Sequence, residues 1–330
     1  MKSLSKKVAI VFTGGTIAMA INKDTKAAIP SLSGYEIMKL FNNHFDDVEI
    51  EIVDFGNYPS PHITIDLLKK LKSVILSLLN RSDICGVVVT HGTDTLEESA
   101  YFLDLTLDSS KPVIFTGSMR NISEDEYDGI NNIKASIRVA IDEKSIGKGV
   151  LVVFNNKIFA ASEVVKISTS SLDAFCSPML GPIGIVDTDK VIFYRNIIPQ
   201  EKILTDTVEE KVSLVKTAIG MDDKLIKFCV DSGDKGIVIE GTGRGNVTPT
   251  MVEGIKYAVA NNVIVVIVSR CLTGRVLDTY GYKGGGKELV SIGAILGENL
   301  NGLKARIKLM LSLGYSSNYE EIKRMFQTAY

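Results

Sequence analysis

The sequence contains few of the residues that build metal and disulfide sites. It has three histidines and four cysteines in 330 residues. The cysteines are far apart and lie mostly within apolar runs, at Cys85, Cys176, Cys229 and Cys271. Neither the histidines nor the cysteines follow a metal-ligand spacing. We expect the cysteines to be buried free thiols of a protein in a reducing compartment. We also expect no bound metal and no cofactor.

Long apolar runs and an excess of charge of one sign are missing as well. The net charge of −2 supplies no field for nucleic acid or an anionic membrane. No apolar stretch approaches the roughly 18 residues that cross a bilayer. The first apolar run, Val8–Phe12, is shorter than the roughly 7 to 15 residues of a signal-peptide core. We therefore expect a cytoplasmic protein without nucleic-acid or membrane partners.

Apolar runs alternate with amphipathic stretches through the first half of the chain, which is typical of α/β folds. Hydrophobic residues make up 45% of the sequence and charged residues 23%, a composition that argues against disorder. The expected strands are Val8–Phe12, Val48–Val53, Ile84–Val89, Val113–Phe115 and Val150–Phe154, and the expected helices are Tyr35–Phe41, Ile65–Leu79, Leu96–Leu103 and Ile130–Ile141. This order predicts a mostly parallel sheet flanked by helices.

A break in this pattern precedes a second, smaller set of alternating elements. The segment at this break contains charged residues and Pro199 and lacks helical periodicity, which is typical of a connection between domains. The elements expected after it are Val212–Ile219, Lys224–Val230, Gly236–Ile239, Pro249–Ala260, Val263–Val268, Leu300–Leu313 and Tyr319–Gln327. We predict an N-terminal catalytic domain over residues 1–190, a linker over 191–211 and a smaller C-terminal α/β domain over 212–330.

Two hydroxyl-rich turns follow strands of the N-terminal domain. Val8–Phe12 runs into Thr13-Gly14-Gly15-Thr16, and Ile84–Val89 runs into Thr90-His91-Gly92-Thr93-Asp94. In open α/β sheets, ligands bind where strands end and helices begin. The two turns therefore predict one shared active site. Because the first turn has neither glycine pattern of a phosphate-binding loop, we expect no nucleotide there.

A threonine hydroxyl in such a site needs a base, because it is a poor nucleophile on its own. His44 and His62 lie outside the two turns, and His91 either braces its turn or transfers protons. A lysine can serve instead, and Lys166 is flanked by apolar and hydroxyl residues, although its spacing equally allows a solvated surface lysine. Asp94 either holds an amino group of a substrate or caps the following helix.

Thr13-Gly14-Gly15-Thr16-Ile17-Ala18, together with His91-Gly92-Thr93-Asp94-Thr95-Leu96-Glu97-Glu98, resembles the bacterial L-asparaginase/glutaminase family. The likeness covers nearly the whole chain, including the turn 117–120 and the segment 241–246. The segment 280–286 and the lack of a signal peptide look more like the cytoplasmic branch of that family than the secreted one.

The resemblance implies an amidohydrolase that converts L-asparagine and water to L-aspartate and ammonia, with weaker activity on glutamine. Thr16 would be the nucleophile that forms an acyl-enzyme, Thr93 and Lys166 would relay protons, and Asp94 would hold the substrate α-amino group. Substrate contacts are implied at Gly15, Asn57, Ser60, Gly92, Thr93, Asp94, Ser118 and Asn246. Asn246 matches a residue that the family contributes from a neighbouring subunit, so we expect a homodimer or homotetramer.

Two positions depart from the family's pattern. The family commonly has a tyrosine on the loop after Thr-Gly-Gly-Thr, where this chain has Ala28 within an expected mobile lid, Asn22–Ser33. The usual serine of the carboxylate contact is replaced by Asn57, and Ser60 is the alternative. The missing tyrosine keeps open a non-catalytic amino-acid sensor on the same fold. An amidotransferase subunit is less expected, because such subunits usually carry an extra N-terminal domain and Val8 begins the first strand almost at once.

Overall fold

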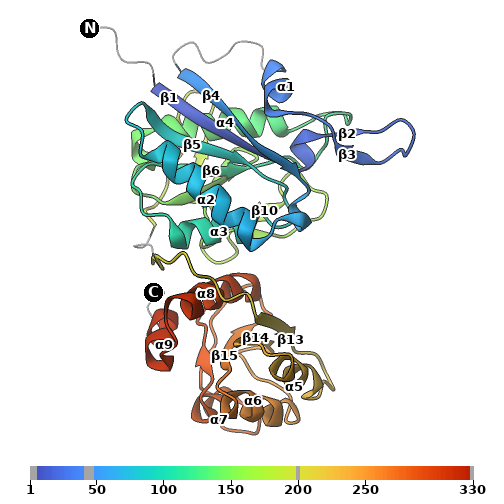
Figure 1. Ribbon diagram of the computed structural model, residues 1–330, viewed down its shortest axis with the longest axis vertical. Helices are drawn as coiled ribbons and strands as arrows, with labels where there is room; N and C mark the ends of the chain where they lie inside the picture. The colour runs from blue at the N-terminus through green and yellow to red at the C-terminus, as the bar shows by residue number, and fades with distance from the viewer. Residues whose placement is uncertain (1–5, 41–47, 198–200, 328–330) are drawn as a thin grey trace. The chain divides into compact units, whose positions relative to one another are not determined.

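The computed structural model describes residues 6–40, 48–197 and 201–327, so Phe41, His44 and Pro199 lie outside the described residues. The chain divides into two compact units, Met1–Lys202 and Ile203–Tyr330, each with its own sheet (Figure 1). A larger and a smaller α/β unit confirm the predicted fold class. The boundary differs from the predicted linker, because Val191–Phe193 is strand β12 of the first unit. Its pairing with a neighbouring strand, β11, includes it in the sheet.

The first unit contains an eight-stranded sheet in the order β12-β11-β8-β7-β6-β5-β1-β4. The strands are β1 (Lys6–Gly14), β4 (Val48–Tyr58), β5 (Ile84–Thr90), β6 (Val113–Thr116), β7 (Val150–Phe154), β8 (Lys157–Ala160), β11 (Gly184–Val186) and β12 (Val191–Phe193). From β4 to β7 all neighbours are parallel, whereas β8, β11 and β12 pair antiparallel. The carboxyl ends of the parallel strands therefore lie along one edge.

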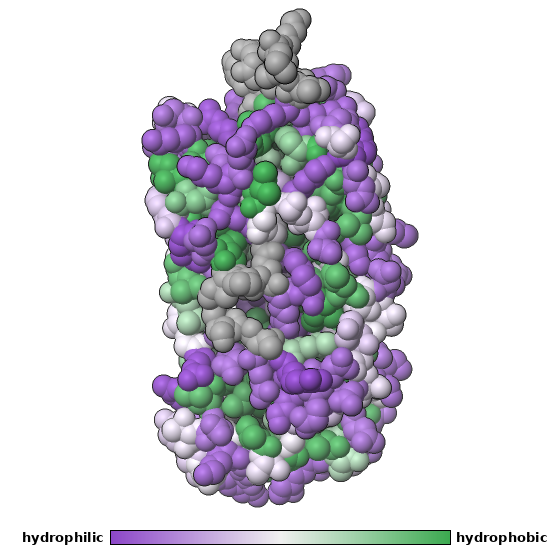
Figure 2. Space-filling model, turned by 90° about the vertical axis from the view of Figure 1, so that its left-hand side faces the viewer, coloured by the Kyte–Doolittle hydropathy of each residue, from purple (hydrophilic) through white to green (hydrophobic). Residues whose placement is uncertain are grey.

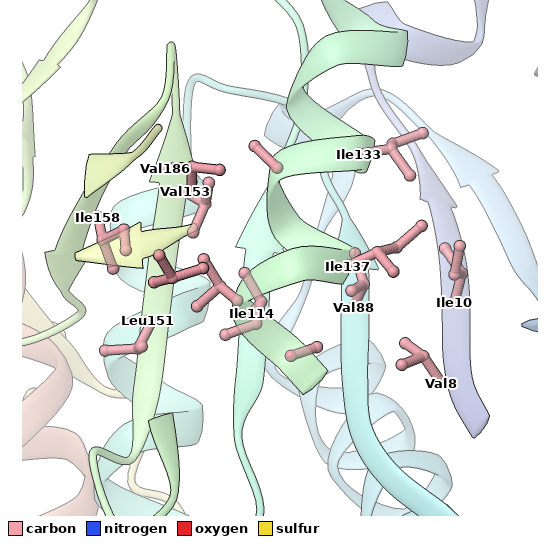
Figure 3. Packing of buried hydrophobic residues seen from close by; sticks show 14 of the residues in the cluster. Val8, Ile10, Val88, Ile114, Ile133, Ile137, Leu151, Val153, Ile158 and Val186 are labelled. Carbon is pink, nitrogen blue, oxygen red and sulfur yellow. The ribbon is translucent and has the colours of Figure 1, made fainter. Parts of the chain in front are cut away.

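Helices cover both faces of this sheet. They are α1 (Gly34–Lys39), α2 (Ile65–Leu79), α3 (Leu96–Thr106) and α4 (Gly129–Ile141). Helix α4 packs Ile133 and Ile137 against side chains of the sheet such as Ile10 of β1 and Val88 of β5, and all four residues are completely buried (Figure 3). Helices α2 and α3 pack on the opposite face (Figure 1). Thr64 caps the N-terminus of α2, since its side chain accepts a hydrogen bond from the Leu67 N–H.

Two short hairpins were not predicted from the sequence. Strands β2 (Met19–Ile21) and β3 (Ala28–Pro30) pair antiparallel within and next to the expected lid. Strands β9 (Val165–Lys166) and β10 (Phe175–Cys176) pair likewise, and β9 carries Lys166. Strands of two or three residues show no periodicity, so only their partners define them.

The second unit contains a parallel sheet in the order β13-β14-β15-β16. Its elements are β13 (Val212–Lys216), α5 (Lys224–Asp231), β14 (Gly236–Gly241), α6 (Met251–Ala260), β15 (Ile264–Ser269), α7 (Gly286–Ile292), β16 (Ile295–Leu296), α8 (Gly302–Tyr315) and α9 (Tyr319–Gln327). The strand predicted to reach Ile219 ends at Lys216. Helix α7 was not predicted, because it begins at the last of three consecutive glycines, which favour a loop.

Polar residues cover most of the face shown in Figure 2, and apolar residues lie between them in small groups. Such a distribution is ordinary for a protein surface in contact with water. Within the described ranges, every helix is too short or too polar to span a membrane.

Candidate active site

Two glycine-containing turns, those after β1 and β5, touch each other. Gly14 and Gly15 have φ angles of +107° and +87°, which glycine adopts readily and other residues do not. A Cβ atom on Gly15 would lie 2.4 Å from both Cα and N of Gly92. A Cβ on Gly14 would lie 2.3 Å from the Tyr58 N atom at the end of β4. Glycine is therefore required for the close approach of the two turns, in which Thr16 directly follows Gly15 and Thr93 directly follows Gly92.

Lys166 reaches from β9 to the turn after β5. Its Nζ atom lies 2.9 Å from Thr93 Oγ1 and 2.6 Å from Asp94 Oδ1. The side chain of Lys166 is 16% exposed, whereas that of Asp94 is 65% exposed. The pair is therefore open to solvent on the Asp94 side, where a ligand can reach the carboxylate. Asp94 does not cap α3, because the N-cap position is Thr95.

A buried carboxylate that the sequence analysis did not select also holds Lys166. Glu97, in the first turn of α3, is 3% exposed, and its Oε2 accepts a 2.6 Å hydrogen bond from the Lys166 backbone N–H. Thr93, Asp94 and Glu97 thus fix both ends of one lysine from a single stretch of chain. The only signal in the sequence was the position of Glu97 in the motif, where it reads as an ordinary acidic residue at a helix N-terminus.

The two candidates for a carboxylate contact, Asn57 and Ser60, occupy different surroundings. Ser60 is buried, its carbonyl accepts a 2.9 Å hydrogen bond from Thr95 Oγ1, and a Cβ on Gly92 would lie 2.8 Å from its Oγ. Asn57 is exposed, and its Nδ2 donates to the Leu32 carbonyl at 3.2 Å. Ser60 therefore packs against the turn after β5, whereas the Asn57 amide binds the segment before α1.

His91 is completely buried within the turn after β5. Burial lowers its pKa to about 4, so the ring is neutral at neutral pH. Its Nδ1 lies 2.7 Å from the Gly92 carbonyl oxygen, and because a carbonyl only accepts, Nδ1 carries the hydrogen. The ring also packs against Phe115 with centroids 5.8 Å apart. These contacts favour the bracing role for His91.

The turn after β6 joins the same group. A Cβ on Gly117 would lie 2.4 Å from the His91 carbonyl oxygen and 3.5 Å from Thr93 Cγ2. Ser118 is buried, and its Oγ has no hydrogen-bond partner among the described residues. An unpartnered buried hydroxyl is costly unless a ligand or water completes it.

Three further positions were predicted from the sequence, Thr16, Ala28 and Asn246. The Thr16 side chain is half-buried, and none of the hydrogen bonds described for this chain involves its hydroxyl. Ala28 lies exposed in β3. Asn246 belongs to the second unit, in the turn after β14, where it is buried and its Oδ1 lacks a hydrogen-bond partner among the described residues. In the described part of the chain, His, Cys, Asp and Glu side chains form no group of three suited to a metal ion.

Two family models match the chain almost end to end. The model described as "Asparaginase, N-terminal" matches residues 7–199, and that described as "Glutaminase/Asparaginase C-terminal domain" matches residues 211–326. The two matched regions correspond closely to the two compact units.

Individual relatives are similar over almost the full chain. An L-asparaginase of Bacillus licheniformis is 38% identical over 98% of this chain and 99% of its own length. One of the subunits of the glutamyl-tRNA(Gln) amidotransferase of Pyrococcus abyssi is 34% identical over 98% of this chain and 76% of its own length. The crystal structure of a probable cytoplasmic L-asparaginase from Campylobacter jejuni superposes with a TM-score of 0.85 at 32% identity, covering 97% of this chain and 99% of that one.

Proposed function

Because the chain belongs to the asparaginase family, we propose that it hydrolyses the side-chain amide of L-asparagine to L-aspartate and ammonia, with weaker activity on L-glutamine. The observation that carries this proposal is the group formed by Lys166 Nζ, Thr93 Oγ1 and Asp94 Oδ1, beside the contact between Gly15 and Gly92. It offers a hydroxyl, a proton relay and an open carboxylate within one small region.

Thr16 is the proposed nucleophile. Its half-buried hydroxyl follows Gly15, which touches the turn that carries Thr93. Attack of the Thr16 oxygen on the amide carbon would break the C–N bond, and the hydroxyl proton would leave with the nitrogen as ammonia. Water would then add to the ester, release aspartate and return a proton to Thr16.

Thr93 and Lys166 are the proposed path for these protons. The 2.9 Å hydrogen bond between them lets the Thr93 hydroxyl exchange a proton with Lys166 while it faces the reacting group. Asp94 has a largely exposed carboxylate, which suits the α-ammonium group of an amino acid while its Oδ1 stays bound to Lys166.

The remaining polar groups are assigned to the substrate carboxylate and to the developing oxyanion. Ser60 is the preferred carboxylate contact because it packs against Gly92, and Asn57 is the second candidate. The Gly15 N–H is donated to the Tyr58 carbonyl at 3.0 Å, so it is not an oxyanion donor. The backbone N–H groups of Thr16, Gly92 and Thr93, with the Ser118 hydroxyl, are the candidates.

We further propose that the active form is a homodimer or homotetramer in which Asn246 completes the site of another subunit. The support is the buried Asn246 Oδ1 that has no partner among the described residues. A cytoplasmic location is proposed from the likeness to the Campylobacter jejuni protein. If Asn246 completes the site of another subunit, dilution of the protein below the dissociation constant of the oligomer should remove its activity.

The first experiment measures ammonia release from L-asparagine and L-glutamine by the purified chain and by Thr16→Ala and Thr93→Val. Each variant should lose at least about a thousandfold in kcat while remaining folded. Thr169→Val is the matched control, because Thr169 is an exposed threonine three residues beyond Lys166, and it should retain full activity.

Acid quenching during turnover should also trap an aspartyl ester on the peptide that contains Thr16. An ester on the Thr93 peptide would exchange the two threonine roles. Binding of asparagine without ammonia release by the wild-type chain would instead favour the amino-acid sensor.

A further inference from the structure

The segment that enters α4 contacts two of the turns around the candidate site. Tyr127, Asp128 and Asn132, which we call the brace, lie at or just before the first turn of that helix. They are separated in sequence from the Thr16 turn by more than a hundred residues. None of them belongs to the catalytic group proposed above.

Tyr127 binds the turn that carries Thr16. Its hydroxyl donates a 2.7 Å hydrogen bond to the carbonyl of Ile17, the residue directly after the proposed nucleophile. Burial raises the phenol pKa, so the hydroxyl keeps its proton and continues to donate. A Cβ on Gly129 would lie 2.3 Å from this hydroxyl and 2.7 Å from Ile17 Cγ1. Helix α4 therefore begins with a glycine where the tyrosine and Ile17 meet.

Asp128 and Asn132 bind the turn after β6. The Asp128 carboxylate accepts hydrogen bonds from the backbone N–H groups of Met119 and Arg120 at 3.0 to 3.2 Å. Asn132 Nδ2 donates to the Gly117 carbonyl at 3.0 Å and to Asp128 Oδ2 at 2.9 Å. Its Oδ1 accepts from the Asn155 N–H at 3.0 Å. Every polar atom of the buried Asn132 side chain is thus engaged.

The sheet order gives these contacts their significance. Strand β5, whose turn carries Thr93, lies between β6 and β1. The brace therefore ties together the two turns that flank the Thr93 turn on either side. Gly117 touches His91 and Thr93 from one side, and Gly15 touches Gly92 from the other. A change in the separation of the outer turns would move Thr16 relative to Thr93.

We propose that Tyr127, Asp128 and Asn132 are positioning residues that hold the Thr16 turn and the Ser118 turn at a fixed separation across the Thr93 turn. The role rests on the proposed amidohydrolase function, because it is defined by the alignment of Thr16 with Thr93 and Lys166. The brace touches no reacting atom. Its loss should therefore slow the chemical step more than it weakens substrate binding.

Two conservative variants test the brace. Tyr127→Phe keeps the ring and removes only the hydrogen bond to Ile17. Asn132→Asp keeps the shape and the acceptor for Asn155 but removes both donations from Nδ2. Each should lower kcat for asparagine by about fivefold or more, because Tyr127→Phe loses one hydrogen bond and Asn132→Asp loses two, and each should leave KM within about twofold.

Asn131→Asp is the matched control. Asn131 is the exposed neighbour of Asn132 on α4, and it lines a polar cavity of about 760 Å³ together with the three brace residues. The control adds the same charge to the same helix without removing a brace contact, so its kcat should equal that of the wild type.

Amide hydrogen exchange provides a readout that does not require turnover. The Met119 and Arg120 N–H groups, which bind Asp128, should exchange faster in Asn132→Asp than in Asn131→Asp. If the wild-type chain released no ammonia, the proposed function would fail, yet faster exchange would still show that the brace holds the turn.

The brace itself is overturned by any of three results. One is kcat within twofold of the wild type in Tyr127→Phe, which decides the matter even if Asn132→Asp does not fold. Another is a rise in KM without a fall in kcat. The third is a loss of kcat in Asn131→Asp that equals the loss in Asn132→Asp.

Discussion

Replacement of Gly15 by alanine should push apart the two turns that form the candidate site. The Cβ of an alanine there would lie 2.4 Å from Gly92 Cα and N, and ordinary contacts begin at 3.4 Å. One turn must therefore move by about 1 Å relative to the other. Both partners of the clash are backbone atoms, so no side chain can rotate away to relieve it.

The magnitude follows from two separate costs. A non-glycine residue at a φ of +87° and a ψ of −177°, a backbone region that is essentially restricted to glycine, costs about 1 to 3 kcal/mol, and the forced displacement costs about 1 to 3 kcal/mol more. A misplacement of about 1 Å between catalytic groups lowers activity by about a hundredfold. We therefore expect a loss of stability of about 2 to 6 kcal/mol and a fall of about a hundredfold in kcat/KM.

Gly147→Ala separates the two costs. Gly147 also has a positive φ, +75°, but an added Cβ would meet no atom within 4 Å. It lies in the first unit with Gly15, so the same unfolding transition reports on both variants. Urea-induced unfolding and steady-state hydrolysis of asparagine should show a loss of about 1 to 2 kcal/mol and unchanged kinetics for Gly147→Ala.

A Gly15→Ala protein that is no less stable than Gly147→Ala and that keeps wild-type kcat/KM would contradict this prediction. Such a result would mean that the turns after β1 and β5 do not touch in solution. Loss of stability with full activity would also refute it, because the displacement would then not reach Thr16 or Thr93.

Two further predictions concern buried carboxylates. Glu97→Leu should lower kcat by about tenfold, because the Lys166 N–H loses its acceptor. Glu97→Gln should retain most activity, since its amide oxygen still accepts the hydrogen bond. Unchanged kinetics in Glu97→Leu would contradict a role for Glu97 in holding Lys166. Burial raises the pKa of Asp104 to about 6, and Lys202, 3.7 Å away, does not offset it. The native state then binds more protons than the unfolded state between the two pKa values, so this group's contribution to stability falls by about 3 kcal/mol as pH rises from about 4 to about 6. The melting temperature of Asp104→Asn relative to the wild type should accordingly be higher at pH 7 than at pH 4.5, and a pH-independent difference would argue against the assignment.

Long elements of the fold were predictable from the sequence. Helix α2 spans Ile65–Leu79 as its periodicity indicates, and β7 spans Val150–Phe154 as expected. Each buries a regular pattern of apolar residues that local sequence specifies. The strands β8 to β12 and β16 were not predicted, because two to four residues carry no period and pair only where a neighbour presents free backbone groups.

The residues of the candidate site differ in how far the sequence alone predicts them. The turns that carry Thr16 and Thr93 follow from the rule that chemistry gathers at the carboxyl ends of parallel strands. Lys166 came from the family resemblance, since its spacing alone also fitted a surface lysine. Glu97 was missed, because its bond to Lys166 joins residues 69 positions apart and its place in the motif equally fits an ordinary acidic residue at a helix N-terminus.

The α/β class, the order of the main strands and helices, and the family could be inferred from the amino-acid sequence alone, because apolar periodicity and two short motifs are local properties of the chain. The contacts between polar groups, by contrast, became visible only in the folded chain. The fold brings the Glu97 carboxylate to the Lys166 backbone N–H, the Tyr127 hydroxyl to the Ile17 carbonyl and Gly15 against Gly92. Such contacts depend on how β1, β5 and β6 are ordered in the sheet and on how α3 and α4 pack against it. That order reflects burial summed over the whole first unit, which no local stretch of sequence contains.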